Sequence, residues 1–467
     1  MKTHITSTIH ADYAVQSDRS GRVGFIEKAG FGAGDAACNM LFNPITLFLS
    51  FFYTDIFGLA PGVVATIFLV VRFADAIFDP FYGAWIDKTT TRWGRFRPWI
   101  IGFAVPFAMS CMVMFYTPDL QGNAKILYAF ITYLILSLLY SGVNIPYCSL
   151  GGVITTNAQE RVSCQQFRFM GAGFASLFCT LTLLPMVAFF GNGNRQMGFF
   201  WVITIFAVIS LFLFVFCVAT TRERVIPKSN AGDSIFNIIR QIMKNDQWVV
   251  CVFAMFLDCI PSFVRGAACI YFAKYVMGLN DYYATLFLST GIVAGILGSY
   301  ITPYFTNRWC KVTVYQACKA IALMMSVGFF FLPAQSVLVV FVWFFVLSVI
   351  HQIGAPILWS FIGDVDDYGD WKTGKRLSGI CASGNLFSLK IALAVSGAMV
   401  GAVLSVTGYQ ANVAIQKASA IAGIYTLMVW IPVVGYLLSV WLVRTRYILT
   451  TAKMKTIEDD LLSTHSE

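Results

Sequence analysis

Long apolar stretches alternate with short polar breaks along almost the whole chain. Twelve stretches are about 20 residues or longer, the length that an α-helix needs to cross a bilayer. They fall at residues 29–54, 62–86, 99–117, 125–150, 165–190, 197–219, 247–277, 283–303, 313–333, 336–362, 379–407 and 420–443. The pattern therefore predicts an all-α integral membrane protein with twelve transmembrane helices.

The longest hydrophilic break, Thr220 to Gln247, divides these spans into two sets of six. Membrane carriers are often built as two pseudo-symmetric bundles around a site near the bilayer midplane. Short basic turns close both the second and the eighth span, at Gly83–Lys88 and Tyr304–Arg308; they agree with a duplication, or only reflect that cytoplasmic turns are basic. We expect an N-terminal tail at 1–28, bundles at 29–219 and 247–446, a middle loop at 220–246 and a C-terminal tail at 447–467.

Basic residues gather in alternate loops, which predicts the orientation of the chain. One set of loops contains Lys88, Arg92, Arg95, Arg97, Arg222, Arg224, Lys228, Arg308, Lys311, Lys372, Lys375 and Arg376. The other set contains only Lys125, Arg195 and Lys417. Because cytoplasmic loops carry the excess of Lys and Arg, both termini are expected in the cytoplasm, which agrees with an even number of spans.

Composition narrows the class of protein further. The 467 residues are 58% hydrophobic and 12% charged, so a soluble fold would expose large apolar patches. The net charge of +9 does not indicate nucleic-acid binding, because the basic residues lie in short loops between apolar stretches. The 12 cysteines show no metal-type spacing and are expected to be free, buried thiols. Residues 1–24 lack an apolar core, so no cleavable signal peptide is expected.

Three charged residues lie on one face of the second span. Arg72, Asp75 and Asp79 are three and four residues apart, which stacks them along a helix. Each isolated charge at the bilayer centre costs roughly 2.5–3.5 kcal/mol on insertion scales, so the three must face protein, water or one another. They could merely hold helices together, but intramembrane ionisable groups are functional by default. We interpret this stripe as the coupling site of a transporter, where guanidinium, proton or metal ion can exchange.

Polar residues in the first and fourth spans indicate a substrate site. Asp35 lies among small residues that permit close helix packing, although an Asp can also simply favour a helix N-terminus. Tyr140, Asn144 and Cys148 follow one stripe beside Pro146 and Tyr147. Hydroxyl, amide and aromatic groups together suit sugar recognition, and helix–helix contact is the alternative.

Further charges lie in the fifth, seventh and eleventh spans. The sequence does not settle whether Arg168 is interior or reaches the cytoplasmic surface. Lys390 lies too deep in its span to reach the surface, and the second-span carboxylates are its expected partners. Asp258 and Arg265 share one face, either as a mutual pair or with Arg265 holding an anionic part of the substrate.

With these residues in place, the chain resembles the glycoside–pentoside–hexuronide:cation symporter family over nearly its whole length. The motifs that carry the resemblance are Tyr53-Thr54-Asp55, the Arg72/Asp75/Asp79 helix, Trp93-Gly94-Arg95-Phe96-Arg97-Pro98, Asn144-Ile145-Pro146-Tyr147 and Asp367-Tyr368-Gly369-Asp370-Trp371, followed by Lys390. The resemblance implies a major facilitator fold, alternating access and cation-driven sugar uptake. It also implies sugar binding at Asp35 and Arg168 and cation binding at Asp75 and Asp79.

Two departures from the family's sodium-using melibiose permease affect the expected ligands. That protein has Asn where this chain has Phe78, and Asp where it has Asn144. Phe78 removes an oxygen ligand, and a metal ion needs several of these while a proton needs one carboxylate. Cys148 replaces a sugar-stacking Trp, so the chain looks closer to the branch that handles α-xylosides and related glycosides. We therefore favour H⁺ over Na⁺ and a substrate other than melibiose, with sulfosugars and hexuronides also in reach.

The sequence as a whole predicts a bacterial inner-membrane sugar symporter, acting as a monomer with no cofactor. The expected substrate contacts are Asp35, Arg72, Tyr140, Asn144, Tyr147, Cys148, Arg168, Arg265, Trp359 and Lys390, and the expected cation contacts are Asp75 and Asp79. Alternatives are a sodium-coupled neutral glycoside symporter and a lysophospholipid carrier, which would need an apolar side cleft. An intramembrane enzyme is disfavoured because the four histidines show no catalytic spacing, and a channel because the chain is duplicated.

Overall fold

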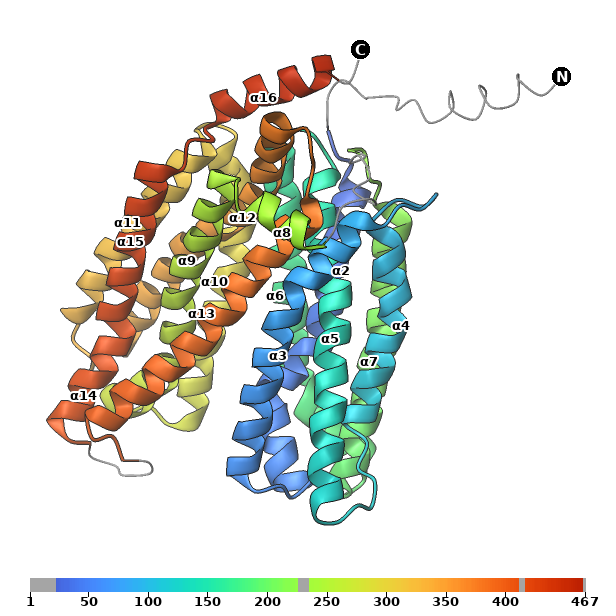
Figure 1. Cartoon of the computed structure of the whole chain (residues 1–467). Coiled ribbons are helices and arrows are strands. Elements are labelled where there is room, and N and C mark those ends of the chain that lie inside the picture. Colours follow the sequence, from blue (N-terminus) through green and yellow to red (C-terminus); the bar gives the residue numbers. More distant parts are fainter. Residues whose placement is uncertain (1–21, 226–234, 411–415, 465–467) are drawn as a thin grey trace.

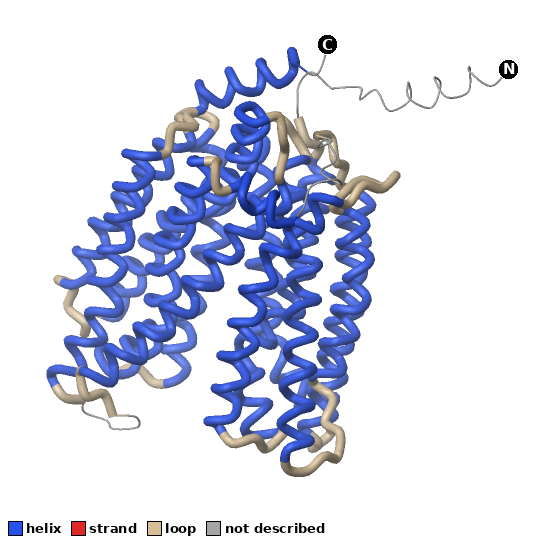
Figure 2. Tube along the Cα trace, in the orientation of Figure 1, coloured by secondary structure: helices blue, strands red, loops and turns tan. Residues whose placement is uncertain are grey.

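The computed structural model describes residues 22–225, 235–410 and 416–464, and long helices dominate this part of the chain (Figures 1 and 2). Twelve membrane-length segments follow one another: α2–η1 (Phe25–Phe51, Phe52–Ile56), α3 (Pro61–Lys88), α4 (Arg97–Met114), α5 (Asn123–Val153), α6 (Ala158–Gly191), α7 (Arg195–Thr220), α9–η2 (Asp246–Tyr271, Phe272–Val276), α10 (Asp281–Thr306), α11 (Lys311–Phe330), α12 (Val337–Thr373), α13 (Ser378–Val406) and α14–η3–α15 (Ala418–Tyr425, Thr426–Trp430, Ile431–Arg446). Two shorter helices, α8 (Ile235–Ile242) and α16 (Thr451–Thr464), lie between and after them.

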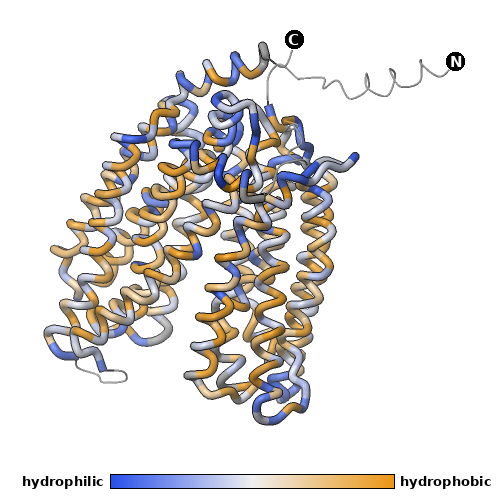
Figure 3. Tube along the Cα trace, in the orientation of Figure 1, coloured by the Kyte–Doolittle hydropathy of each residue, from blue (hydrophilic) through white to orange (hydrophobic). Residues whose placement is uncertain are grey.

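The helices coincide with the predicted spans, and ten of them among the described residues are long and apolar enough to cross a membrane on composition alone. Figure 3 shows the apolar residues along the shafts of the helices and the hydrophilic ones at their ends. Two spans were predicted too short. Helix α6 begins at Ala158 because the Asn157 side chain accepts hydrogen bonds from two backbone N–H groups of its first turn. Helix α12 continues to Thr373, where Gly374 in the left-handed conformation ends it.

The two sets of six helices form two bundles that converge at one end of the molecule and diverge at the other (Figure 1). We call the converging end the basic end, because it carries α16 and the basic loops that follow α3, α7, α10 and α12. Helix α13 of the second bundle packs on α3, and α10 and α12 pack on α6. These crossings hold the bundles together.

The ends of the first and seventh spans preserve a trace of duplication that is clearer than the two basic turns. Both spans finish in a π-helical turn, η1 or η2, followed by a glycine with positive φ. The backbone bonds also match: Leu59 N–H donates to the Tyr53 carbonyl, and Leu279 N–H donates to the Ala273 carbonyl. Because a π-turn is rare, its recurrence at the same place in each bundle supports the internal repeat.

Glycines and charged groups join the bundles at the basic end. A Cβ on Gly379 would lie 2.4 Å from the Gly83 carbonyl oxygen, so α3 and α13 meet backbone to backbone. The Asp87 carboxylate accepts hydrogen bonds of 2.8 and 2.9 Å from the backbone N–H groups of Gly379 and Ile380. A carboxylate of one bundle therefore satisfies free donors in the first turn of a helix of the other.

A cluster of buried ion pairs completes this junction. Arg161 of α6 lies 3.4 Å from Asp364 and 2.5 Å from Asp367 of α12. Lys311 pairs with Asp364, and Arg376 pairs with Asp366 and Asp367. We call these six residues the ion-pair cluster. Its three cations and three carboxylates balance, which is what a buried network requires.

The cysteines also follow the prediction. All twelve are free, and all but Cys259 and Cys310 are buried.

Candidate functional site

A first polar group lies inside the N-terminal bundle, where α2 and α6 approach closely. A Cβ on Gly171 would lie 2.3 Å from the Gly32 carbonyl oxygen, so the two backbones touch. This contact brings Asp35 of α2 beside Arg168 of α6, with Arg168 Nε donating to Asp35 Oδ2 at 3.2 Å. Both residues are buried, which answers the question of whether Arg168 is interior.

Arg168 also contacts the C-terminal bundle. Its guanidinium carbon lies 4.1 Å from the centre of the Trp359 ring of α12 and 5.4 Å from that of Tyr147. The guanidinium also donates from Nη1 to Gln165 Oε1 at 3.4 Å. A cation over an indole face is worth about 2 kcal/mol when it is desolvated. Arg168 is therefore oriented by a carboxylate on one side and by an aromatic residue of the other bundle.

The fourth-span residues line the same region. Tyr140 stacks on Phe42 with ring centres 4.6 Å apart, and the Tyr147 hydroxyl donates to the Phe31 carbonyl at 2.6 Å. Cys148 donates its S–H to Asn144 Oδ1 at 3.7 Å, in line with the stripe that the sequence indicated. Because Tyr147 is bonded to backbone, its ring face, rather than its hydroxyl, is free to interact with Arg168.

A second polar group joins the two bundles directly. Lys390 of α13 places its Nζ 2.7 Å from Asp75 Oδ2 and 2.8 Å from Asp79 Oδ2 of α3, which confirms its expected partners. The Ser141 hydroxyl of α5 lies 2.9 Å from Asp75 and 2.8 Å from Asp79 and can donate its one proton to either, while Lys390 donates to the same hydroxyl oxygen at 3.0 Å. An ammonium group thus lies where two buried carboxylates could instead hold a proton or a metal ion.

Arg72 and Phe78, two other residues of the second span, have surroundings different from those of Asp75 and Asp79. Arg72 interacts with Tyr133 of α5. Phe78, which we treated as a lost metal ligand, has 48% of its surface exposed, while Asp79 beside it is fully buried. Among the described residues, no group of three or more His, Cys, Asp or Glu side chains could hold a metal ion.

The seventh-span charges do not pair with each other, so that alternative was wrong. Asp258 lies 2.7 Å from Lys319 of α11. Arg265 donates to the Met428 carbonyl and to the hydroxyls of Tyr436 and Ser326, all on α11 or the twelfth span. The two residues do share a face, but it packs inside the C-terminal bundle. Lys319, which pairs with Asp258 and also lies 3.0 Å from His351 Nδ1, had no partner that sequence spacing could identify.

Ser141 and Gln165 are the site residues that the sequence reasoning missed. Ser141 adjoins Tyr140, so its side chain points about 100° away from the stripe through Tyr140, Asn144 and Cys148. Its position became informative only when α5 was placed against α3. Gln165 precedes Arg168 by three residues and so faces the same side of α6, a spacing that could have identified it.

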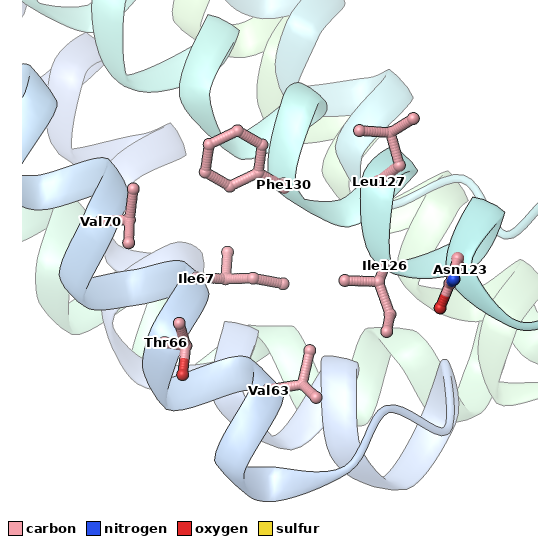
Figure 4. Close-up of a pocket in the computed structure, with 8 residues that line it drawn as sticks. All are labelled: Val63, Thr66, Ile67, Val70, Asn123, Ile126, Leu127 and Phe130. Atoms are coloured by element: carbon pink, nitrogen blue, oxygen red, sulfur yellow. The ribbon is translucent and has the colours of Figure 1, made fainter.

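An apolar groove lies between α3 and α5, toward the end opposite the basic end (Figure 4). It encloses about 650 Å³ and is lined by Val63, Thr66, Ile67, Val70, Asn123, Ile126, Leu127 and Phe130. Neither Arg168 nor Lys390 contributes to its lining. A lysophospholipid carrier needs an apolar cleft that leads to its phosphate-binding charges, whereas this groove is lined by neither Arg168 nor Lys390.

The chain is similar to known transport proteins over nearly all of its length. Residues 30–451 match the family described as MFS/sugar transport protein. The inner membrane symporter YicJ of Escherichia coli is 40% identical, with 93% of this chain and 94% of that protein covered. The isoprimeverose transporter of Lactiplantibacillus pentosus is 35% identical over 94% of this chain and 92% of its own length. A putative sulfoquinovose importer of Salmonella typhimurium is 29% identical, with 86% of this chain and 85% of that protein covered.

Solved structures agree on the fold. The fucose:proton symporter FucP of Escherichia coli superposes with a TM-score of 0.67 at 15% identity, over 91% of this chain and 98% of that one. A bacterial homologue of the iron transporter ferroportin in an outward-facing state gives a TM-score of 0.66 at 14% identity, over 92% and 99%. These likenesses show the major facilitator fold. The chain belongs to the MFS/sugar transport protein family and, within it, to the glycoside–pentoside–hexuronide:cation symporters of the major facilitator superfamily.

Proposed function

We propose that this protein imports a neutral glycoside together with a proton, by alternating access between its two bundles. The observation that carries the proposal is Lys390, whose ammonium group pairs with both Asp75 and Asp79 across the bundle interface. A proton on this carboxylate pair would weaken its hold on Lys390. The charge of the site, and the contact between bundles, would then depend on cation binding.

The charges of the two central polar groups favour a neutral substrate. Asp35 pairs with Arg168, and Lys390 pairs with both carboxylates of α3. Arg265, whose contact with substrate would have favoured an anionic sugar, donates to three oxygen atoms inside the C-terminal bundle. The isoprimeverose transporter is one of the relatives, and a neutral glycoside agrees with its name.

Asp35, Gln165 and Arg168 would bind sugar hydroxyls through bidentate polar contacts, with Trp359 as the aromatic residue beside the sugar. From the basic loops we infer that the basic end faces the cytoplasm. In this arrangement both termini are cytoplasmic, and the bundles diverge toward the outside.

The test is sugar-triggered proton movement in sodium-free membrane vesicles, with neutral xylosides and galactosides beside anionic sugars. We expect external alkalinisation with a neutral glycoside. Alkalinisation only with an anionic sugar would return Arg265 to the substrate site, and a response that requires sodium would overturn proton coupling.

A further inference from the structure

The C-terminal helix α16 packs against the basic end and joins the C-terminal bundle. Met454 and Ile457 are almost completely buried. The Trp371 indole of α12 donates to Asp460 Oδ2 at 3.0 Å, and the Lys453 ammonium lies 4.9 Å from the centre of the same indole ring. These contacts attach α16 to α12.

One residue of α16 extends the contact to the other bundle. Glu458 Oε1 accepts a hydrogen bond of 3.2 Å from the backbone N–H of Ala158, the first residue of α6. Arg161, three residues further along α6, belongs to the ion-pair cluster that joins the bundles. The helix therefore spans the junction that must separate when the basic end opens.

The charges around Glu458 make this contact sensitive to protonation. Arg161 faces it from α6, Asp364 and Asp367 face it from α12, and Lys311 of α11 is already paired with Asp364. The three cations and three carboxylates of the cluster balance one another, so the cluster has no net positive charge to offset ionised Glu458. Burial is the largest influence and raises the pKa of Glu458 to about 7; Arg161 and the Ala158 N–H lower the pKa, and Asp367 and Asp364 raise it, by smaller amounts.

The direction of the pH effect follows from linkage. Because the pKa is higher when α16 is docked, the docked helix binds the proton more tightly than the released helix does. Docking is therefore strongest below the ordinary Glu pKa of 4.5 and weakens as the pH rises toward about 7. Above that value it stays at its weakest.

We propose that α16 is a latch on the basic end, in which protonated Glu458 holds the N-terminus of α6 against the C-terminal bundle and delays opening of that end. If the basic end is cytoplasmic, as the proposed function has it, acidification of the cytoplasm slows release of substrate into it. A symporter that imports protons would then limit its own turnover as protons accumulate.

Amide hydrogen exchange of residues 451–464 tests the latch on the full-length protein in lipid nanodiscs. A released 14-residue helix is only marginally stable in water, so loss of docking exposes its amides. After correction for the intrinsic pH dependence of exchange, we expect protection to fall on the order of tenfold between pH 5.5 and 7.5. Glu458→Gln, which keeps the acceptor oxygen, should show less than a twofold change, and Asp459→Asn, on the exposed neighbour, should behave as the parent protein does.

Equal protection at both pH values in the parent protein, or an undiminished pH dependence in Glu458→Gln, would overturn the latch. Sugar counterflow in right-side-out vesicles then measures its effect on transport, with the internal pH set to 6.0 or 7.5. Counterflow should be slower at pH 6.0 in the parent protein, slow at both values in Glu458→Gln and fast at both after deletion of 451–464. A deletion variant that keeps the parent's pH dependence would contradict the role in transport. Because none of these readouts needs net proton import, they remain decisive if the coupling ion proves to be sodium.

Discussion

At the scale of single residues, the centre of the molecule contains two charge groups with different surroundings. Arg168 has a carboxylate on one side and an aromatic ring on the other, which suits it to orient a polar, uncharged ring. Lys390 has two carboxylates and a hydroxyl, which suits it to alternate with a small cation. The two groups can therefore be disturbed separately.

Replacing Asp79 should separate coupling from substrate binding. Asp79→Asn removes one of the two charges that hold Lys390, so we expect concentrative uptake to fall by at least tenfold while sugar counterflow persists. Uptake and counterflow are compared in the same vesicles, with Asp119→Asn on an exposed loop as the matched control. Lost sugar binding with intact cation coupling would contradict the assignment.

Replacing Trp359 should instead weaken substrate binding. Trp359→Ala removes the ring over the Arg168 guanidinium, an interaction of about 0.5–2 kcal/mol, so the sugar Kd should rise about 2- to 30-fold. Trp359→Phe should recover part of the affinity. Binding is measured by calorimetry on purified protein, with the exposed Trp441→Phe as control, and an unchanged Kd in Trp359→Ala would remove this residue from the site.

At the scale of helices, close crossings at glycine position the charged groups. The α2–α6 contact at Gly32 and Gly171 sets the distance between Asp35 and Arg168. Small residues allow this approach in membranes, where packing rather than water exclusion drives association. The distance between Asp35 and Arg168 therefore depends on two residues that have no side chain.

Gly171→Ala tests this dependence. A Cβ at 2.3 Å from the Gly32 carbonyl oxygen forces the helices apart, and overpacking of this kind typically costs about 1–3 kcal/mol. We expect a lower Tm and a weaker sugar Kd. Gly397→Ala, where nothing lies within 4 Å, should leave both unchanged, and equal behaviour of the two variants would contradict the packing argument.

At the scale of the whole molecule, the two bundles meet through glycine crossings, a carboxylate at a helix N-terminus and the ion-pair cluster. All of these lie at the basic end, and the bundles diverge beyond the central site (Figure 1). Breaking one buried ion pair leaves an unmatched charge, so the bundles separate at this end only when the ion pairs of the cluster that join them break together. That cooperativity suits a two-state transporter.

Gly379→Ala should shift the balance between those states without disturbing either bundle. The added methyl group would lie 2.4 Å from the Gly83 carbonyl oxygen, a contact between the two bundles at the basic end. Hydrogen exchange at the end of α3 should rise severalfold, with the Tm nearly unchanged. Gly401→Ala, whose Cβ meets nothing within 4 Å, is the control. A large fall in Tm without faster exchange would show that the crossing supports the fold rather than the state.

The sequence by itself determined the membrane fold, the twelve spans and the partners of Lys390. The reason is that the length of an apolar stretch, and the energetic cost of a charge inside it, can both be judged from that helix alone. It also indicated the stripe of Tyr140, Asn144 and Cys148, since the helical repeat decides which residues share a face. The pairing of Arg168 with Asp35 and Trp359, the bridging role of Ser141, the inward direction of Arg265 and the contact between Glu458 and Ala158 were decided only by the tertiary structure. The physical reason is that helical periodicity specifies direction relative to a residue's own helix, whereas these contacts depend on which helices cross, at what depth and in which rotation.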